Sequence, residues 1–362
     1  GGINVGSSIV NYKYVPDVDK TEVFLPTINN FAKAHSDKKV FVLGCGDNYI
    51  EVIAENKDKY ESNVITHCPS LEDIRKLIRK EDFYQLCDKY GIDRPKTFIH
   101  NKDMGLDFEL NFDAPYILKP SNSVMYWDFP FEGKKKVFKL DSREELDSTL
   151  EKVYNSGYTD RMIIQEFIPG NDTAMRVLTN YSDSNGKVKM MALGHVLLEE
   201  HTPKGIGNHA VIITEPNEEL MQKYKTFLEE IGFVGFSNFD IKYDERDKKY
   251  KAFEINVRQG RSNYYVTAGG CNIAKCLVEE YILKENNDVK FVTDKILWMV
   301  VPKKVAFKYI PEYKEEMQEL IKAKKCINPL FYKKDKKLIR NLRLLKAYFA
   351  YFKKYKDYGN GR

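Results

Sequence analysis

Long apolar runs are missing from this chain of 362 residues, which argues against a helix that spans a membrane. The first residues, Gly1 to Asn4, do not form a basic segment followed by an apolar one, so we expect no secretion signal. Cysteines are also few: the six are scattered, with no CxxC pair and no histidine at zinc-ligand spacing. We therefore expect a cytoplasmic protein with reduced cysteines and no structural zinc.

Common signs of covalent catalysis are missing too. The sequence has no GxSxG motif and no recognisable Cys/His pair, and its six histidines are dispersed. These absences disfavour an enzyme that forms an intermediate on a serine or cysteine. What is present, 43% apolar and 31% charged residues, is typical of a globular protein, and the length exceeds one ordinary domain.

Positive charge is concentrated at the C-terminal end. Residues 333–362 hold 11 Lys and Arg against 2 Asp, whereas residues 1–332 hold 47 basic and 51 acidic side chains. The net charge of +5 therefore averages a basic tail and a slightly acidic body. This distribution disfavours nucleic-acid binding by the whole fold, although the tail itself suits an anionic partner.

Apolar periodicity and turn residues divide the chain into four segments. We expect an α/β domain over 1–94 that ends in a linker helix at 71–90, mixed α/β subdomains over 95–168 and 169–332, and a helical tail over 333–362. Further helices are predicted at 143–156 and 218–231, and strands at 40–43 and 63–66. Gly44 and Gly46 lack the third glycine of a dinucleotide fingerprint, so we favour a packing turn there over a nucleotide site.

Two alternating segments, 237–243 and 250–258, flank a polar turn and predict a β-hairpin. Phe239 and Ile255 then face the core. The opposite side carries the polar residues Asn238, Asp240, Glu254, Asn256 and Arg258. Oxygen ligands without His or Cys suit magnesium that also binds substrate phosphates. The competing interpretation is a solvated face that binds no ligand.

Two further segments carry weaker signals. The apolar strand 114–120 places Lys119 near its end, where a lysine either extends its head to water or binds a phosphate. The apolar strand 161–170 ends in Pro169-Gly170. Unpaired backbone groups there either meet the edge of a base such as adenine or mark an ordinary strand end.

The order of these signals along the chain resembles the ATP-grasp superfamily, which includes D-alanine–D-alanine ligase, biotin carboxylase and many carboxylate–amine ligases. The resemblance covers about residues 40–285. It implies an α/β (α+β) ATP-grasp fold, in which an N-terminal α/β domain, incomplete in this chain, precedes two subdomains that clasp ATP. It also implies ATP and two Mg²⁺ ions as cofactors.

The resemblance also implies roles for individual residues. It places ATP against Lys80, Lys119, Gln165, Glu166, Phe167, Ile168 and Asp172. It assigns the magnesium ions to Asp240, Glu254 and Asn256. The catalytic residues it implies are Arg258, which would face the γ-phosphoryl group, and Lys119.

Three long strings are most similar to the D-aspartate ligase branch of bacterial cell-wall enzymes: KPSNSVMYWDFPFEGKKKVF (119–138), GHVLLEEHTPKGIGNHAVI (194–212) and FEINVRQGRSNYYVTAGG (253–270). This similarity implies that ATP drives the joining of the β-carboxyl group of D-aspartate to the lysine side-chain amine of a peptidoglycan precursor. The donor's second carboxylate needs further contacts, for which the candidates are Arg261, Arg176, Lys204 and Ser262. Surface roles for Arg176 and Lys204 are an open alternative.

Two other functions stay open at this point. The first is an ATP-grasp ligase for another amino acid or small carboxylate. The second is a non-catalytic nucleotide-binding protein that is tethered by its basic tail. The presence of Asp240, Glu254, Asn256, Lys80 and Lys119 weighs against the second, because a tether needs none of them.

The tail carries an apolar stripe at helical spacing, formed by Leu338, Leu342, Leu345, Phe349 and Phe352. We favour an amphipathic helix whose stripe packs on the body of the protein. The alternative is peripheral contact of residues 333–356 with an anionic surface, such as the inner face of a membrane. Nucleic acid is disfavoured because the aromatic residues do not alternate with exposed cations.

Overall fold

The computed structural model describes residues 4–121, 123–203 and 205–359. The chain divides into two compact units. Unit 1 comprises the residues up to 74 together with 171–241 and 255 onward, and unit 2 comprises residues 75–170 and 242–254. The chain therefore passes through unit 2 twice, first over a long segment and then over the tip of a hairpin.

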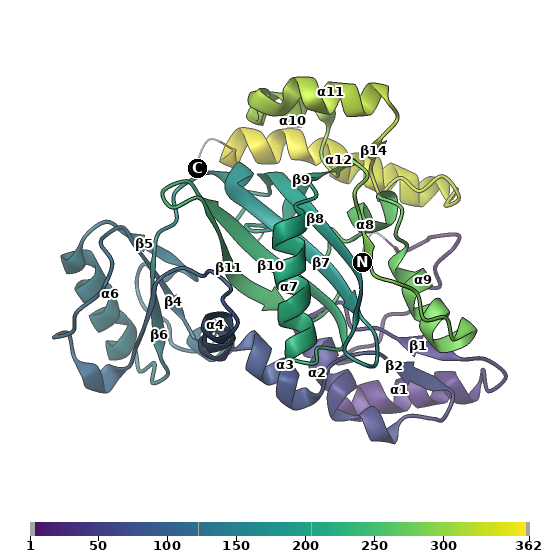
Figure 1. Ribbon diagram of the computed structural model, residues 1–362, viewed down its shortest axis with the longest axis horizontal. Coiled ribbons are helices and arrows are strands. Elements are labelled where there is room, and N and C mark those ends of the chain that lie inside the picture. The colour runs from purple at the N-terminus through teal and green to yellow at the C-terminus, as the bar shows by residue number, and fades with distance from the viewer. Residues whose placement is uncertain (1–3, 122, 204, 360–362) are drawn as a thin grey trace. The chain divides into compact units, whose positions relative to one another are not determined.

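An eight-stranded sheet runs through unit 1 in the order β11-β10-β7-β8-β9-β13-β14, with β12 beside β8 (Figure 1). Its strands are β7 (Met175–Ser182), β8 (Val188–Glu199), β9 (His209–Thr214), β10 (Gly235–Asp244), β11 (Lys249–Asn256), β12 (Lys290–Phe291), β13 (Leu297–Met299) and β14 (Cys326–Ile327). The central neighbours β7, β8, β9 and β13 pair antiparallel. Nearly every residue of β8 is buried, because both faces of the sheet are covered.

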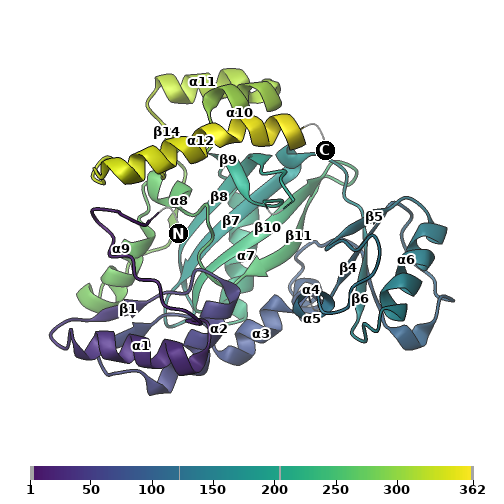
Figure 2. The ribbon, with the colours of Figure 1, turned by 180° about the vertical axis from the view of Figure 1, so that it is seen from behind.

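Helix α7 (Glu218–Glu230) covers one face of this sheet (Figure 1). The Asn217 side chain caps its first turn by accepting from the Leu220 amide, and Tyr224 and Phe227 pack edge-on against Phe239 of β10. The later helices of unit 1 are α8 (Tyr264–Ala268), α9 (Ile273–Val278), α10 (Lys303–Tyr309), α11 (Lys314–Lys322) and α12 (Leu338–Tyr358). Helices α10, α11 and α12 lie together beside one end of the sheet (Figure 2).

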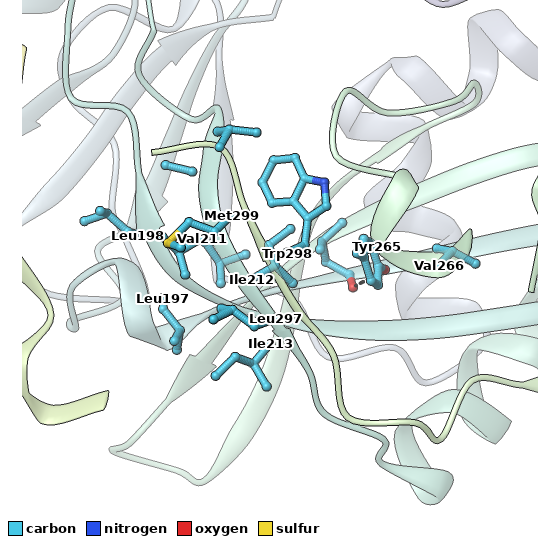
Figure 3. Close-up of a cluster of buried hydrophobic side chains, with 14 of the residues drawn as sticks. Leu197, Leu198, Val211, Ile212, Ile213, Tyr265, Val266, Leu297, Trp298 and Met299 are labelled. Atoms are coloured by element: carbon cyan, nitrogen blue, oxygen red, sulfur yellow. Dashed lines mark hydrogen bonds between the residues drawn. The ribbon is translucent and has the colours of Figure 1, made fainter. Parts of the chain in front are cut away.

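The core of unit 1 lies where β8, β9 and β13 meet α8 (Figure 3). Leu197, Ile212 and Trp298 are almost completely buried there. The Tyr265 hydroxyl of α8 donates to the Ala192 carbonyl of β8 at 2.7 Å, which satisfies its polar end inside the core. Each large side chain buried in this way stabilises the fold by about 1.5–3 kcal/mol.

The N-terminal part of unit 1 contains the parallel pair β1 (Val40–Val42) and β2 (Val64–Thr66). Helices α1 (Thr21–Lys33) and α2 (Asp47–Glu55) flank this pair. A Cβ atom on Gly44 would lie 2.9 Å from the Ile50 backbone nitrogen, so the glycine turn packs closely on α2. This contact favours the packing-turn interpretation.

Unit 2 is built on an antiparallel sheet in the order β3-β6-β4-β5. Its elements are α4 (Lys80–Lys89), β3 (Thr97–His100), β4 (Tyr116–Pro120), α5 (Ser123–Tyr126), β5 (Phe138–Leu140), α6 (Arg143–Asn155) and β6 (Met162–Glu166). The Ser142 side chain caps α6 by accepting from the Glu145 amide. Leu146 and Leu150 of that helix are buried in the core of unit 2.

The prediction of one helix over residues 71–90 is wrong. Arg79 is extended, with φ −74° and ψ 115°, and separates α3 (Leu71–Ile78) from α4. No glycine or proline marks this position, so apolar periodicity does not reveal the break. The break makes Lys80 the first residue of α4.

The predicted tail helix is confirmed as α12, but the predicted packing of its apolar stripe is wrong. The helix buries Arg340, Leu344, Tyr351 and Tyr355 instead. Leu342 and Phe349 of the stripe are both 57% exposed. None of the described helices combines the length and apolar character that a bilayer span requires.

Candidate active site

The predicted hairpin is confirmed as β10 and β11, which are hydrogen-bonded neighbours in the large sheet. Phe239 and Ile255 are buried, as the alternation predicts. The Asn256 amide nitrogen lies 3.3 Å from an Asp240 carboxylate oxygen, so these two side chains share one face. The hairpin tip, residues 242–254, belongs to unit 2, which therefore contains Glu254.

Two lysines of unit 2, Lys80 and Lys119, are connected to the hairpin tip by hydrogen bonds. The Lys80 ammonium lies 2.6 Å from a Glu254 carboxylate oxygen. Lys119, on β4, donates to the Gln165 side-chain oxygen of β6 at 3.0 Å. The Gln165 amide in turn donates to the Tyr84 hydroxyl, which donates to the Phe253 carbonyl. Helix α4, strands β4 and β6, and the hairpin tip thus fix the positions of both cations.

The environment of Lys119 disfavours the charged form of its side chain. Burial, reinforced by the nearby Lys80 ammonium, lowers the pKa of Lys119 to about 7, while Glu254 acts in the opposite direction. An incoming anion would stabilise the ammonium form and raise this pKa. The site therefore favours a ligand with negative charge, such as a phosphate.

The end of β6 is held by a buried cluster of charges. Glu166 accepts from the Lys96 amide and from the Lys251 ammonium, and it also pairs with Arg246. Lys251 and Arg246 pair with Asp244 as well, and the Arg246 hydrogen bond holds the pKa of Asp244 far below its usual range. The Glu166 side chain therefore joins β6 to the hairpin tip, and both of its carboxylate oxygens accept hydrogen bonds from unit 2.

Phe167 and Ile168 follow directly after β6. The Phe167 amide donates to the Pro115 carbonyl at 3.2 Å, and Ile168 is buried. The Lys139 and Lys242 ammonium groups lie 4.7 and 5.7 Å from the centre of the Phe167 ring. The predicted adenine-binding segment is thus a partly exposed aromatic residue beside two cations.

Arg258 of unit 1 lies next to the amide-bearing side of the hairpin. Its guanidinium donates to an Asp47 carboxylate oxygen at 2.8 Å and to the Asn256 side-chain oxygen at 3.1 Å. The Arg258 backbone carbonyl accepts from the Asn238 amide at 2.6 Å, and Asn238 accepts from the Thr179 hydroxyl. The Arg258 side chain and backbone are therefore both held in place by hydrogen bonds.

The segment after Arg258 presents two of the predicted donor-binding residues. The Ser262 hydroxyl is hydrogen-bonded to His209 at 3.2 Å, and burial followed by the Arg261 charge lowers the pKa of His209 to about 4. The Arg261 side chain is 54% exposed and lies 3.9 Å from a Glu200 oxygen. Lys354 of α12 contacts the other Glu200 oxygen at 2.6 Å. Arg261 thus presents a largely exposed cation beside the hydrogen-bonded pair Ser262 and His209.

The remaining predicted residues lie elsewhere. Arg176 pairs with Glu215 at 2.7 Å and donates to the Thr173 and Met175 carbonyls, contacts that suit a structural role. Asp172, predicted to bind ribose, accepts from the Glu199 amide and lies 2.6 Å from the His201 ring. Lys204 lies outside the described residues.

The predicted magnesium ligands do not form a complete metal site by themselves. Among the described residues, no group of three or more His, Cys, Asp or Glu side chains could hold a metal ion. Asp240, Glu254 and Asn256 supply two carboxylates and one amide, so phosphate oxygens and water would have to complete the shell of an ion. The ion pair of Glu254 with Lys80 shows that one of these carboxylates already compensates a cation.

Two acidic residues in these surroundings were not among the predicted site residues. Asp47 orients Arg258, and Glu200 lies between Arg261 and Lys354. Asp47 follows the Gly44-Cys45-Gly46 turn directly, so the turn that we interpret as packing also places a hydrogen-bond partner for Arg258. No sequence signal pointed to Glu200, because its partners are distant in the chain.

Comparison with curated proteins gives one extensive similarity. The chain is 42% identical over 368 residues to a D-aspartate ligase of Enterococcus faecium (strain Aus0004), with 97% of this chain and 87% of that protein covered. A D-alanine–D-alanine ligase of Wolbachia pipientis subsp. Culex pipiens (strain wPip) is 24% identical over 190 residues, covering 52% of this chain and 55% of that protein. No protein-family model matches the chain.

Solved structures confirm the predicted fold. Biotin carboxylase of Campylobacter jejuni aligns with a TM-score of 0.52 and 14% identity, covering 71% of this chain and 58% of its own. An N5-carboxyaminoimidazole ribonucleotide synthetase aligns with a TM-score of 0.52 and 13% identity, covering 82% and 72%. At such low identity these similarities establish the ATP-grasp fold alone.

Proposed function

Because this chain belongs to the D-aspartate ligase family of ATP-grasp enzymes, we propose that it joins the β-carboxyl group of D-aspartate to a lysine side-chain amine of a peptidoglycan precursor. The observation that carries the proposal is the 42% identity, which extends over 97% of the chain. The reaction would convert ATP to ADP and phosphate. Because it consumes ATP, we place it in the cytoplasm.

The chemistry requires activation of a poor electrophile. A carboxylate does not react with an amine in water, so the β-carboxylate would first attack the γ-phosphorus of ATP and release ADP. The resulting acyl phosphate would then react with the neutral amine, forming the amide and releasing phosphate, which takes the proton that the amine loses. The protein's contribution is to position the two anions and to compensate their mutual repulsion.

The cations of the site suit that task. Lys119 and Lys80 of unit 2 would bind ATP phosphates, and Arg258 of unit 1 would stabilise the charge that develops on the transferred phosphoryl group. Asp240, Glu254 and Asn256 would hold two magnesium ions together with phosphate oxygens. Magnesium supplies charge neutralisation when it is bound. Lys80 would then exchange its contact with Glu254 for a phosphate oxygen.

The other proposed ATP contacts lie at the end of β6 and in the residues that follow it. The Glu166 carbonyl and the Ile168 amide would face the adenine edge, beside Phe167 and Gln165. The Asp172 carboxylate would bind ribose only after a change in its contact with His201.

The donor's second carboxylate needs a cation that serves neither ATP nor the fold. Arg261 meets this condition because its side chain is largely exposed, and Ser262 lies next to it. Arg176 is already engaged by Glu215 and two carbonyls, so we leave it out of the proposed donor site.

A donor screen tests the proposal. ADP release would be measured with D-aspartate, L-aspartate, D-glutamate and D-alanine, each with and without a muropeptide precursor that contains lysine. We expect amine-dependent release that is strongest with D-aspartate, because a site built for a second carboxylate leaves its cation unpaired with the other donors. Equal activity with D-alanine would contradict the dicarboxylate donor, and release with a different carboxylate would identify another ATP-grasp ligase.

A further inference from the structure

Helix α12 presents a continuous apolar stripe to solvent. Its members Leu338, Leu342, Leu345, Phe349 and Phe352 are 41% to 71% exposed. At about 100° per residue, these five side chains fall within an arc of about 80° on the helix. A contiguous apolar surface of this kind marks a binding site more often than single exposed residues do.

The stripe is exposed although the helix itself is firmly attached to the protein. The opposite side of α12 buries Leu344, Tyr351 and Tyr355 in the body of unit 1. The Tyr355 hydroxyl donates to the Glu199 carbonyl at 2.5 Å, and Lys354 pairs with Glu200. The stripe is therefore a second apolar face on a helix that is already anchored.

Exposed cations lie along one side of this stripe and before it in the chain. Arg343, Lys346, Lys353 and Lys356 of the helix are all exposed, and so are the four lysines that precede it, Lys333, Lys334, Lys336 and Lys337. Of the two acidic residues of this stretch, Asp335 is buried and bonded to Ser7, Ser8 and Arg340, and Asp357 is exposed. The stretch therefore presents a strong positive charge beside its apolar side chains.

The same network brings further apolar side chains to the start of α12. The Ser7 hydroxyl donates to Asp335 at 2.6 Å, and the Ser8 amide donates to its other oxygen at 2.8 Å. Ile9 and Val10 follow directly and are 54% and 44% exposed. Two further exposed apolar side chains thus follow directly after the residues that bind Asp335, which precedes α12.

We propose that the α12 stripe binds the surface of an anionic lipid bilayer, with the helix lying in the plane of the interface. The apolar side chains would enter the boundary between headgroups and acyl chains, and the neighbouring cations would contact lipid phosphates. This inference does not depend on the ligase reaction.

Charge favours this occupant over a second copy of the chain. A symmetric contact through the stripe would bring the same cations of both copies together, and their repulsion would oppose association. Nucleic acid would match the charge but would leave Leu338, Leu342 and Leu345 without apolar partners, whereas a bilayer satisfies both features.

Co-sedimentation of the full chain with vesicles tests the proposal. Vesicles of equal parts phosphatidylglycerol and phosphatidylcholine would be compared with vesicles of phosphatidylcholine alone, at low and high salt. We expect binding to the anionic vesicles that weakens as salt rises. The double variant Leu342→Ser/Phe349→Ser should bind about 100-fold more weakly, because two large side chains no longer enter the bilayer.

Matched variants separate this surface from general effects. Ile282→Ser/Leu283→Ser removes two exposed apolar side chains from another part of unit 1 and should leave vesicle binding unchanged. Lys346→Glu/Lys353→Glu should weaken binding on the order of 100-fold, whereas Lys38→Glu/Lys39→Glu makes the same change in charge away from α12 and should have little effect. Thermal unfolding of each variant verifies its fold.

Three results would overturn the proposal. The first is that the intact protein does not sediment with anionic vesicles at low salt. The second is that the folded stripe variant binds vesicles as tightly as the original protein. The third is a dimer in light scattering that the stripe variant loses, together with no vesicle binding, because the stripe would then be an interface between two copies.

Discussion

Two groups of cations in this molecule differ sharply in their surroundings. Lys80 and Lys119 of unit 2 lie among a carboxylate, an amide and a tyrosine, and the pKa of Lys119 is lowered to about 7. Arg343, Lys346 and Lys353 of α12 are exposed beside apolar side chains. Because the first pair is buried, a single bound anion would change the protonation of its lysines. The exposed cations of α12 instead attract anionic partners through their summed charge.

The greatest loss of activity is predicted for substitutions of the hairpin carboxylates. Asp240→Asn and Glu254→Gln should each lower ADP release by about 10³-fold or more, because each removes negative charge that would bind magnesium and position the phosphates. The matched control is Glu245→Gln at the exposed turn of the same hairpin, which should stay within about twofold. Near-normal turnover of either site variant at limiting magnesium would contradict the metal assignment.

The second effect compares the two faces of α12. Tyr355→Ala should lower the free energy of unfolding by about 3 kcal/mol, because it removes a buried ring and leaves the Glu199 carbonyl without its donor. Phe349→Ala should change it by less than about 0.5 kcal/mol. Urea denaturation measures both. Equal losses would mean that the exposed stripe also packs on the protein.

The third effect concerns the donor site. Arg261→Ala should raise the KM for D-aspartate about 100-fold with a smaller change in kcat, because the lost cation binds a carboxylate that does not react. Arg176→Ala should instead lower the melting temperature, since its contacts are with Glu215 and the backbone. A kcat loss in Arg261→Ala without a KM change would place that residue at the reacting atoms.

The fourth effect is a pH dependence of ATP binding through Lys119. With a pKa of about 7, this lysine is largely neutral above neutral pH, and phosphate binding would raise its pKa and take up a proton. Affinity for ATP should therefore fall up to about tenfold per pH unit above pH 7. Calorimetry in buffers of different ionisation enthalpy counts the protons. The uptake should disappear in Lys119→Arg, whose guanidinium stays charged; an unchanged uptake would exclude Lys119 as its source.

Strong local patterns were predictable from the sequence. The hairpin alternates strictly, so the burial of Phe239 and Ile255 follows from period two alone. The helices over 143–156 and 218–231 start at Ser142 and Asn217, whose side chains cap them. The break at Arg79 was not predictable, because no residue type there disfavours a helix.

The prediction of which side of α12 is buried failed for a different reason. Both sides of this helix are rich in large side chains, and Leu and Phe carry no polar group, whereas Tyr carries a hydroxyl that must be satisfied when it is buried. The side with Tyr351 and Tyr355 is nevertheless the buried one. Tyrosine can pack its ring and still satisfy its hydroxyl, as Tyr355 does on the Glu199 carbonyl. Contacts between residues so far apart in the chain leave no local signal.

The most direct test of the proposed reaction follows an oxygen atom. D-aspartate labelled with oxygen-18 in its β-carboxylate would be incubated with ATP, magnesium and the lysine-containing precursor, and the released phosphate would be analysed by mass spectrometry. We predict one labelled oxygen in each phosphate, because attack of the β-carboxylate on the γ-phosphorus transfers that oxygen to phosphorus. Unlabelled phosphate, or label that arrives from the α-carboxylate instead, would contradict activation of the β-carboxyl group.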